Sequence, residues 1–376
     1  MKSQNKRKES LRSSFMILSI GKHLPPNRLD QSEAVDFARK QFGKHFRDID
    51  RLLPVFQSAD IDTRYFAMPV EWYIAGPTFE EKNAKYVSLA VEYATKAILE
   101  CLESTYYLNN KVDCSEVDAI FFVSTTGIST PSIEARIMNV LPFSTHTKRI
   151  PIWGLGCAGG AAGLSRAHEY CLAHPKENVI VINVELCSLT FQHGDFSKSN
   201  LIGTALFADG TSCVLLCGKD SSLLKRSQLS CLPEVQSTCS TLMKHSEDVM
   251  GWDVSNQGLH VVFSKSIPSI VSTWLEPNVR EFLTSQNIED IDYFIAHPGG
   301  TKVLSSYEEA LGLDQSQTAI SRSILRQFGN MSSVTIIFVL DQFLREGCKT
   351  GATGLMAALG PGFCSELLLL VWKEVR

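Results

Sequence analysis

The sequence predicts an α/β fold made of two halves of the same design. The first observation is that short, nearly continuous apolar runs alternate with longer segments of helical spacing, as in buried strands and their connecting helices. The second is that the order of elements repeats between the two halves of the chain. The third is size, because 376 residues with 44% hydrophobic and 20% charged residues can build a large core.

The first half is expected at residues 15–225, after a basic tail at 1–14. A helix at 84–103 leads to a strand, then to a helix that starts at Cys157, and then to two further strands. Residues 191–200 are polar and turn-rich, so we expect a loop there. The expected strands are FMILSIG (15–21), VDAIFFVSTT (117–126), NVIVINVEL (178–186) and SCVLLCG (212–218).

The second half is expected at residues 226–376. A helix at 266–285 leads to a strand, and a helix that starts near Asn330 follows. An acidic residue opens the apolar run in both VDAIFFV and IDYFIAH, so the halves match in pattern as well as in order. The expected strands are IDYFIAH (291–297), GATGLMAALG (351–360) and SELLLLVW (365–372).

Composition excludes several classes of protein. A net charge of −4 without a basic stripe argues against nucleic-acid binding. No apolar run reaches the ~18 residues that a membrane span needs, and the basic tail is expected to precede a strand rather than to act as a signal peptide. Eleven cysteines without C-x-x-C pairs indicate reduced thiols in the cytoplasm. The histidines form no metal-binding pattern, so no metal is expected.

The stretch GLGCAGGAAG places Cys157 among small residues at the expected start of a helix. It has neither the G-x-G-x-x-G context of a dinucleotide site nor a P-loop, so its glycines indicate close helix packing. The helix dipole and the free N–H groups of a first turn favour a thiolate, which predicts a lowered pKa for Cys157 and a nucleophilic role. The alternative is a small buried cysteine chosen for packing.

His297 and Asn330 are the candidate partners of this thiol. His297 ends a buried strand and is followed by Pro-Gly-Gly, a sequence that delivers a side chain to a cleft. Asn330 begins the second-half helix in the place where Cys157 begins the first-half helix. As an alternative, Asn330 is a helix N-cap, which contributes about 1 kcal/mol. If the two halves pack through these helices, the three residues converge.

The motifs GLGCAGGAAG, IAHPGG, FGNMSS and ALGPG resemble the successive signatures of type III polyketide synthases, the chalcone-synthase-like branch of the thiolase superfamily. The resemblance runs from about residue 15 to residue 372 and is greatest to bacterial alkylpyrone and alkylresorcinol synthases. It implies a duplicated five-layer αβαβα thiolase fold, a homodimer and an acyltransferase. It also implies that acyl-CoA and malonyl-CoA are substrates and that no cofactor is needed.

The resemblance assigns roles to the three residues. Cys157 would carry the acyl group of a starter acyl-CoA, and His297 would pair with its thiol. His297 and Asn330 would hold the thioester carbonyl, promote decarboxylation of malonyl-CoA and stabilise the enolate that extends the chain. The starter would be aliphatic and often long-chain, and the product an α-pyrone or a resorcinol.

The resemblance also outlines a substrate cavity. Phe207 would be a gatekeeper between the CoA tunnel and the cavity, although a core aromatic is the alternative from the residues alone. Val261 occupies the place of a second gatekeeper. Arg64 is a candidate for CoA binding, or else for a salt bridge that supports the fold. The remaining cavity residues would be Thr125, Thr126, Thr130, Cys187, Thr190 and Ser332, with the wall formed by Gly360, Pro361 and Gly362.

Three other functions stay open at this point. A β-ketoacyl carrier-protein synthase III shares the Cys, His and Asn set and performs a single condensation. A papain-like cysteine hydrolase has the same chain order, but it requires a C-G-[SA]-C-[WY] motif and a disulfide-rich context that are absent. A non-catalytic interaction protein would leave Cys157 no more reactive than an average thiol.

Overall fold

The computed structural model describes residues 15–46, 48–264 and 266–375, so the predicted tail at 1–14 lies outside the described residues. The strands of these residues form a nine-stranded mixed sheet and two small two-stranded antiparallel sheets. The strands are β1 (Phe15–His23), β2 (Asn27–Asp30), β3 (Thr63–Phe66), β4 (Ala119–Val123), β5 (Lys148–Ile152), β6 (Asn178–Leu186), β7 (Asp209–Gly218), β8 (Cys231–Leu242), β9 (Met250–Ser255), β10 (Gly258–Phe263), β11 (Tyr293–Ala296), β12 (Thr353–Gly360) and β13 (Cys364–Glu374).

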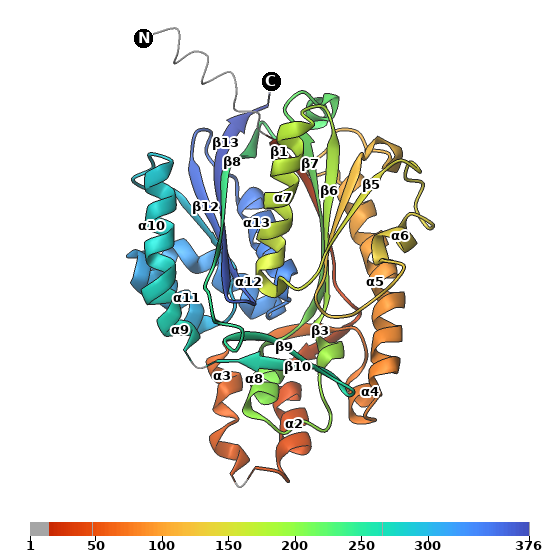
Figure 1. Cartoon of the computed structure of the whole chain (residues 1–376), viewed down its shortest axis with the longest axis vertical. Coiled ribbons are helices and arrows are strands. Elements are labelled where there is room, and N and C mark those ends of the chain that lie inside the picture. The colour runs from red at the N-terminus through yellow and green to blue at the C-terminus, as the bar shows by residue number, and fades with distance from the viewer. Residues whose placement is uncertain (1–14, 47, 265, 376) are drawn as a thin grey trace.

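The helices lie between and around the strands of this sheet (Figure 1). A short 3₁₀ turn at 156–158 precedes the helix at 159–173, a second at 187–190 follows β6, and a third at 332–334 precedes the helix at 335–346. The helices are α2 (Gln31–Phe42), α3 (Pro54–Ser58), α4 (Val70–Ile74), α5 (Phe79–Leu102), α6 (Ile133–Ile137), α7 (Gly159–Ala173), α8 (Lys198–Leu206), α9 (Ile267–Ile270), α10 (Glu276–Ser285), α11 (Thr301–Leu311), α12 (Ala319–Phe328) and α13 (Thr335–Glu346).

The sheet confirms the predicted duplication. Its order is β11-β12-β13-β8-β1-β7-β6-β4-β5, and the two halves meet where β1 pairs with β8 over only two residues. In the first half, parallel β4 and β6 are followed by antiparallel β7 and β1; in the second, parallel β11 and β12 are followed by antiparallel β13 and β8. The predicted division after residue 225 falls in a 3₁₀ turn (Ser222–Arg226) before β8.

The layers follow from this duplication. Helices α7 and α13 lie between the two half-sheets, α5 covers the first half-sheet from outside, and α10 and α11 lie outside the second (Figure 1). Strands such as β6 and β7 are buried along their whole length because helices cover both faces, which explains their continuous apolar sequence. The five layers are therefore α, β, α, β and α, as expected.

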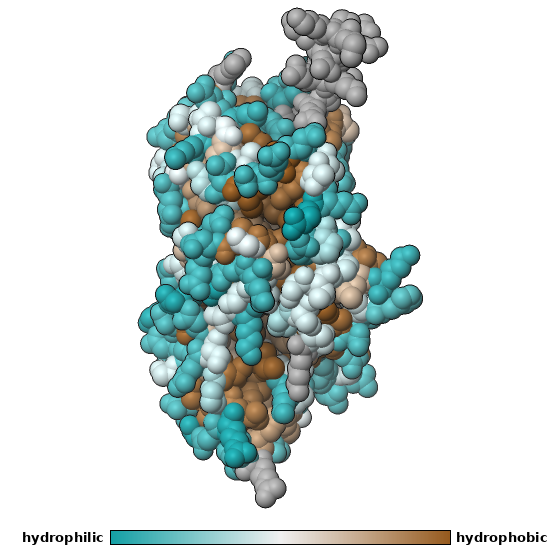
Figure 2. Space-filling view, turned by 90° about the vertical axis from the view of Figure 1, so that its left-hand side faces the viewer, coloured by the Kyte–Doolittle hydropathy of each residue, from teal (hydrophilic) through white to brown (hydrophobic). Residues whose placement is uncertain are grey.

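Two of the predicted helices differ from the observed ones in their bounds. The helix predicted at 84–103 begins at Phe79, because Thr78 accepts a hydrogen bond from the backbone of Glu81 and donates its own N–H to the Glu81 carboxylate. The helix predicted at 266–285 is divided into α9, a π-helical turn and α10. The predicted loop at 191–200 ends earlier than expected, at the first residues of α8. Among the described residues, no helix is long and apolar enough to cross a membrane. The face shown in Figure 2 is mostly hydrophilic, and hydrophobic residues gather on it in patches.

The small residues of α7 allow the two central helices to approach each other, as the glycine pattern indicated. A Cβ atom on Gly160 would lie 2.2 Å from the backbone oxygen of Ser333, and one on Gly163 would lie 2.8 Å from Val181. Real Cβ atoms do not come this close to backbone atoms, and the backbone of Ser333 cannot move without displacing α13.

We expect Gly160→Ala to lower the free energy of unfolding by about 1–3 kcal/mol, the usual cost of overpacking a close contact. Denaturant unfolding of the full chain measures this change. Gly194→Ala is the matched control, because a Cβ at Gly194 meets nothing within 4 Å among the described residues. Equal stability of the two variants would contradict the assigned contact.

Candidate active site

Cys157 lies in the 3₁₀ turn Gly156–Ala158, and α7 begins at Gly159, two residues after the helix start predicted at Cys157. The thiol is 8% exposed, and it is reached through a small cavity. The preceding residue, Gly156, has a positive φ of 45°, and a Cβ there would lie 2.7 Å from the ring of Pro361. A glycine is therefore needed beside Cys157 for both conformational and steric reasons.

Asn330 lies directly opposite Cys157. The Cys157 thiol is 4.0 Å from the Asn330 side-chain oxygen, to which it is oriented as a donor. The same oxygen accepts a 2.8 Å bond from the backbone of Ser332, so Asn330 also holds the 3₁₀ turn before α13, close to the predicted capping role. Its amide nitrogen donates to the carbonyl of Gly299, 3.1 Å away.

His297 follows β11 directly, and its backbone continues the pairing with β12 through a 2.9 Å bond to Ala357. Its ring lies beside Gly299, whose carbonyl holds Asn330. Both ring nitrogens are buried and have no hydrogen-bond partner among the described residues. Burial lowers the pKa of His297 to about 3, so the imidazole is neutral at physiological pH.

The predicted low pKa of Cys157 is wrong in this structure. Burial raises the pKa of the Cys157 thiol to about 11, and interactions with Ser332 and Asn330 reduce this rise only in part. Desolvation is the largest influence on this thiol, and Cys157 lies before the first turn of α7 rather than in it. In the resting form, the Cys157 thiol is protonated and the His297 imidazole is neutral.

A buried carboxyl group that the sequence did not reveal lies behind the thiol. Glu185, on β6, accepts hydrogen bonds from the backbone of Thr125 at 3.0 Å and from the hydroxyl of Ser333 at 2.8 Å. Burial raises the pKa of Glu185 to about 7, and the negative charge of its ionised form disfavours a thiolate on Cys157. Glu185 thus ties the first half of the chain to the turn that carries Ser332 and Ser333.

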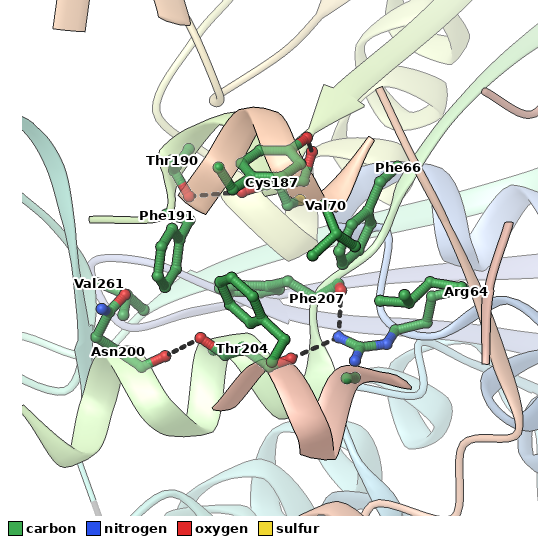
Figure 3. Close-up of a pocket in the computed structure, with 16 residues that line it drawn as sticks. Arg64, Phe66, Val70, Cys187, Thr190, Phe191, Asn200, Thr204, Phe207 and Val261 are labelled. Atoms are coloured by element: carbon green, nitrogen blue, oxygen red, sulfur yellow. Dashed lines mark hydrogen bonds between the residues drawn. The ribbon is translucent and has the colours of Figure 1, made fainter. Parts of the chain in front are cut away.

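Two cavities meet next to Cys157. The first, the Cys157 cavity, spans about 360 Å³ of space that is partly open to solvent, and it includes Cys157 and Ser332 in its lining. The second, called here the apolar pocket, spans about 580 Å³ of space that is also partly open to solvent, and it lies between α2, α4, α8, the 3₁₀ turn at 187–190 and β10 (Figure 3). Both cavities share Cys187, Phe207 and Val261 in their linings. Phe207 therefore borders both cavities, and its role as a gatekeeper between a CoA tunnel and the cavity stays a prediction.

Phe207 is held from two sides. Its segment forms an isolated parallel bridge with Asn330, in which Ala208 donates to the Asn330 carbonyl at 2.9 Å. The Arg64 guanidinium donates to the carbonyls of Thr204 at 2.6 Å and Phe207 at 2.9 Å. Arg64 is 1% exposed, so it supports the fold at Phe207 and is not placed to meet a CoA phosphate at the surface.

The structure separates the other cavity candidates into two groups. Cys187, Thr190, Ser332 and Pro361 line one or both cavities, and Gly360 and Gly362 flank Pro361. The three threonines at 125, 126 and 130 line neither cavity. The hydroxyls of Thr125 and Thr126 accept backbone bonds from Gly156 and Leu186, whereas Thr130 is exposed and precedes a cis proline.

A hairpin that the sequence analysis did not identify closes the Cys157 cavity. Strands β9 and β10 pair only with each other and contribute Met250, Trp252 and Phe263 to the lining. The Trp252 indole donates to the Thr125 carbonyl at 3.0 Å, and its ring centre lies 6.1 Å from that of Phe207. The alternating polar and apolar residues at 250–263 were the available signal for this hairpin.

Comparison with protein families decides the assignment. The model of chalcone and stilbene synthases, N-terminal domain, matches residues 2–221, and that of the C-terminal domain matches residues 234–373. The chain belongs to the chalcone and stilbene synthase family. It is a type III polyketide synthase, an acyltransferase with the duplicated thiolase fold. This assignment excludes the papain-like hydrolase and the non-catalytic interaction protein.

Two curated relatives and one solved structure show how far the likeness extends. The chain is 51% identical over 361 residues to a putative chalcone synthase of Bacillus subtilis strain 168, covering 95% of this chain and 99% of the relative. It is 34% identical over 360 residues to the 1,3,6,8-tetrahydroxynaphthalene synthase of Streptomyces peucetius subsp. caesius, covering 95% and 93%. The crystal structure of the 1,3,6,8-tetrahydroxynaphthalene synthase of Streptomyces coelicolor A3(2), a bacterial type III polyketide synthase, superposes with a TM-score of 0.85 at 27% identity, covering 95% and 99%.

The raised pKa of Cys157 yields a prediction for its alkylation. Because the thiolate reacts and the thiol does not, the rate of labelling by iodoacetamide should rise about tenfold per pH unit between pH 7 and 10, without a plateau. Peptide mass spectrometry of the Cys157 peptide measures this rate. Ser332→Ala should slow the reaction further at each pH, since it removes a hydrogen bond that lowers the pKa of Cys157. A plateau near pH 8 would contradict the assigned burial effect.

Proposed function

We propose that this polyketide synthase loads an aliphatic, long-chain acyl-CoA starter onto Cys157, extends it repeatedly with malonyl-CoA and closes the product to an α-pyrone or a resorcinol. The observation that supports this proposal is the apolar pocket on the far side of Phe207. Most of its lining side chains are apolar or aromatic, among them Leu29, Ala34, Phe37, Phe66, Val70, Phe191 and Val261. An alkyl chain buried there gains about 25 cal/mol per Å² of apolar surface removed from water.

Loading needs a proton acceptor, because the resting thiol is protonated. Cys157 attacks the thioester carbon of acyl-CoA while its proton moves to the neutral imidazole of His297. The tetrahedral intermediate then expels the CoA sulfur, which takes the proton from His297. An acyl-Cys157 thioester and free CoA result, and His297 is neutral again for the next step.

Extension uses His297 and Asn330 as hydrogen-bond donors to the thioester carbonyl of malonyl-CoA. With malonyl-CoA bound, the ring N–H of His297 and the amide N–H of Asn330 donate to the thioester carbonyl oxygen. Loss of CO₂ leaves an enolate whose negative charge these donors stabilise in a cavity that excludes most water. The enolate carbon attacks the acyl-Cys157 carbonyl, and the carbon–sulfur bond to Cys157 breaks. Cys157 leaves as a thiolate that takes a proton from water, and the product is a β-ketoacyl-CoA two carbons longer, which acylates Cys157 again before the next extension.

We propose that the enzyme works as a cytoplasmic homodimer, with CoA thioesters as substrates and no cofactor. Ile128, Val140 and Trp153 are large apolar side chains that are each about half exposed, and β5 is an edge strand of the sheet. Exposed apolar side chains of this size support an interface with a second copy of the chain. Among the described residues, no group of three or more His, Cys, Asp or Glu side chains could hold a metal ion.

A second candidate function is synthesis of a polyhydroxylated aromatic product without a long starter. The relative that is 34% identical is a 1,3,6,8-tetrahydroxynaphthalene synthase, and another, from Pseudomonas fluorescens Pf-5, is a phloroglucinol synthase at 28% identity. A single condensation, as in a β-ketoacyl carrier-protein synthase III, is the third outcome to be distinguished.

A panel of acyl-CoAs from acetyl to palmitoyl, each with malonyl-CoA, should yield pyrone or resorcinol masses, with the highest kcat/KM for long aliphatic starters. High-resolution mass spectrometry identifies the products. Products from malonyl-CoA alone, unchanged by added acyl-CoA, would favour the second candidate. A single acetoacetyl-type thioester made from a carrier protein would overturn the iterative reaction.

Cys157→Ala should abolish acylation of the protein by dodecanoyl-CoA while leaving it folded, because Cys157 is the proposed acyl carrier and Cys187, which also lines both cavities, is not expected to replace it. Intact-protein mass spectrometry after mixing detects the added acyl mass. Cys231→Ala, at the start of β8, is the matched control and should load normally. Acyl loading that persists in Cys157→Ala would refute the assignment.

His297→Ala should reduce CO₂ release from malonyl-CoA by about 10²–10³-fold, the usual effect of removing one donor to a developing oxyanion. Release of ¹⁴CO₂ from labelled malonyl-CoA measures this step separately from product formation. His146→Ala, on an exposed turn, is the control and should match the unaltered enzyme. Unchanged CO₂ release by His297→Ala would remove its proposed role.

A further inference from the structure

Lys82, in the first turns of α5, is a buried cation that the reaction described above does not use. It is 4% exposed, and its ammonium group donates to the carbonyl of Phe191 and to the side-chain oxygen of Gln192, both at 3.0 Å. No carboxylate forms an ion pair with it in the described part of the chain. A buried charge held only by neutral acceptors is costly for stability, so its position calls for an explanation.

Gln192 extends the contacts of Lys82 to three other segments. Its side-chain nitrogen donates to the carbonyls of Thr190 at 2.9 Å and Leu259 at 3.0 Å. Its backbone carbonyl accepts a 2.9 Å bond from the side chain of Asn200, on α8. Gln192 is itself 4% exposed. Lys82 and Gln192 therefore connect α5, the segment after β6, α8 and β10.

These connected segments form one wall of the apolar pocket. Thr190, Phe191 and Asn200 line it, and Val261, two residues after Leu259, lines both cavities. Figure 3 shows these four side chains together on one side of the pocket, with Phe207 beside them and Arg64 on the opposite side. Neither Lys82 nor Gln192 lines either cavity, so they act on the wall from behind.

The wall needs such support because the central sheet does not provide it. Strand β10 pairs with β9 alone, and the 187–190 segment is a single 3₁₀ turn. Gly258, at the start of β10, has a φ of +134°, and a Cβ there would lie 2.7 Å from the Gln192 side-chain nitrogen. The backbone of β10 is thus drawn closely against Gln192, at a position where only glycine fits.

We propose that Lys82 and Gln192 are a positioning pair that fixes this wall and thereby determines the length of acyl chain that the apolar pocket accepts. The inference rests on the proposed long-chain function. Without the ammonium group, the Gln192 side-chain oxygen no longer accepts a hydrogen bond from Lys82. That bond orients the Gln192 side-chain nitrogen toward Leu259. Val261 and Phe191 then shift relative to Phe207, and the pocket no longer matches an extended alkyl chain.

Lys82→Met removes the charge and the donors but keeps an unbranched side chain. We expect KM for dodecanoyl-CoA to rise about tenfold, the effect of a small mismatch in an apolar pocket. The kcat for dodecanoyl-CoA and both constants for hexanoyl-CoA should change less than twofold, because Cys157 and His297 are untouched. Lys82→Arg retains a cation with several donors and should restore most of the affinity for dodecanoyl-CoA.

Gln192→Glu provides a second variant that does not leave the ammonium group unpaired. The carboxylate keeps the contact with Lys82 but cannot donate to Thr190 and Leu259, so the same selective rise in KM is expected, while the new ion pair with Lys82 limits the loss of thermal stability. If Lys82→Met fails to fold, this variant decides the question. The effect of Gln192→Glu is measured by steady-state kinetics and by thermal unfolding.

The outcomes separate this inference from the function on which it rests. If the unaltered enzyme does not accept dodecanoyl-CoA, the proposed function fails. If it does, and Gln192→Glu keeps the KM values of the unaltered enzyme for both starters, the positioning role is overturned. Equal increases in KM for hexanoyl-CoA and dodecanoyl-CoA, accompanied by a lower melting temperature, would also overturn it, because they indicate a general structural role.

Discussion

The close contact between α7 and the turn before α13 is the constraint on which the site depends. Gly160 approaches the Ser333 backbone so closely that no side chain fits between them. The hydrogen bond from Ser333 to the buried carboxyl of Glu185 holds the same junction from the sheet side. Because Cys157 lies just before α7 and Asn330 just before the turn, this junction sets their 4.0 Å separation. The duplicated fold thus brings Cys157 of the first half and Asn330 of the second half, both predicted catalytic residues, into contact.

Burial determines the chemistry of the groups that meet there. Loss of solvent raises the pKa of Cys157 and of Glu185 and lowers that of His297, so the thiol and the imidazole rest in neutral forms. A neutral imidazole can accept a proton in loading and donate a hydrogen bond in decarboxylation. The same loss of solvent strengthens hydrogen bonds to a developing oxyanion. In its resting state the site therefore holds a protonated thiol rather than a pre-formed thiolate.

The pocket beside the site is built mainly from segments outside the nine-stranded sheet. Two buried cations hold its walls through carbonyl groups: Arg64 binds those of Thr204 and Phe207, and Lys82 binds that of Phe191. Carbonyl oxygens of short turns have free lone pairs that helices and strands would otherwise use. A cation with several donors can satisfy them and join segments that share no regular backbone pairing.

The sequence by itself determined the two-half α/β design and identified three candidate residues for the condensing site. Continuous apolar runs mark strands that are covered on both faces, and motifs mark Cys157, His297 and Asn330, because these signals are local. Only the tertiary structure decided that Thr125 and Thr126 support backbone while Thr130 is exposed, that Arg64 is buried, and that Trp252 closes the cavity. It also reversed the expected pKa of Cys157. The reason is that desolvation and hydrogen-bond partners depend on chain segments such as residues 125 and 252, which are far apart in sequence and meet only when the core packs.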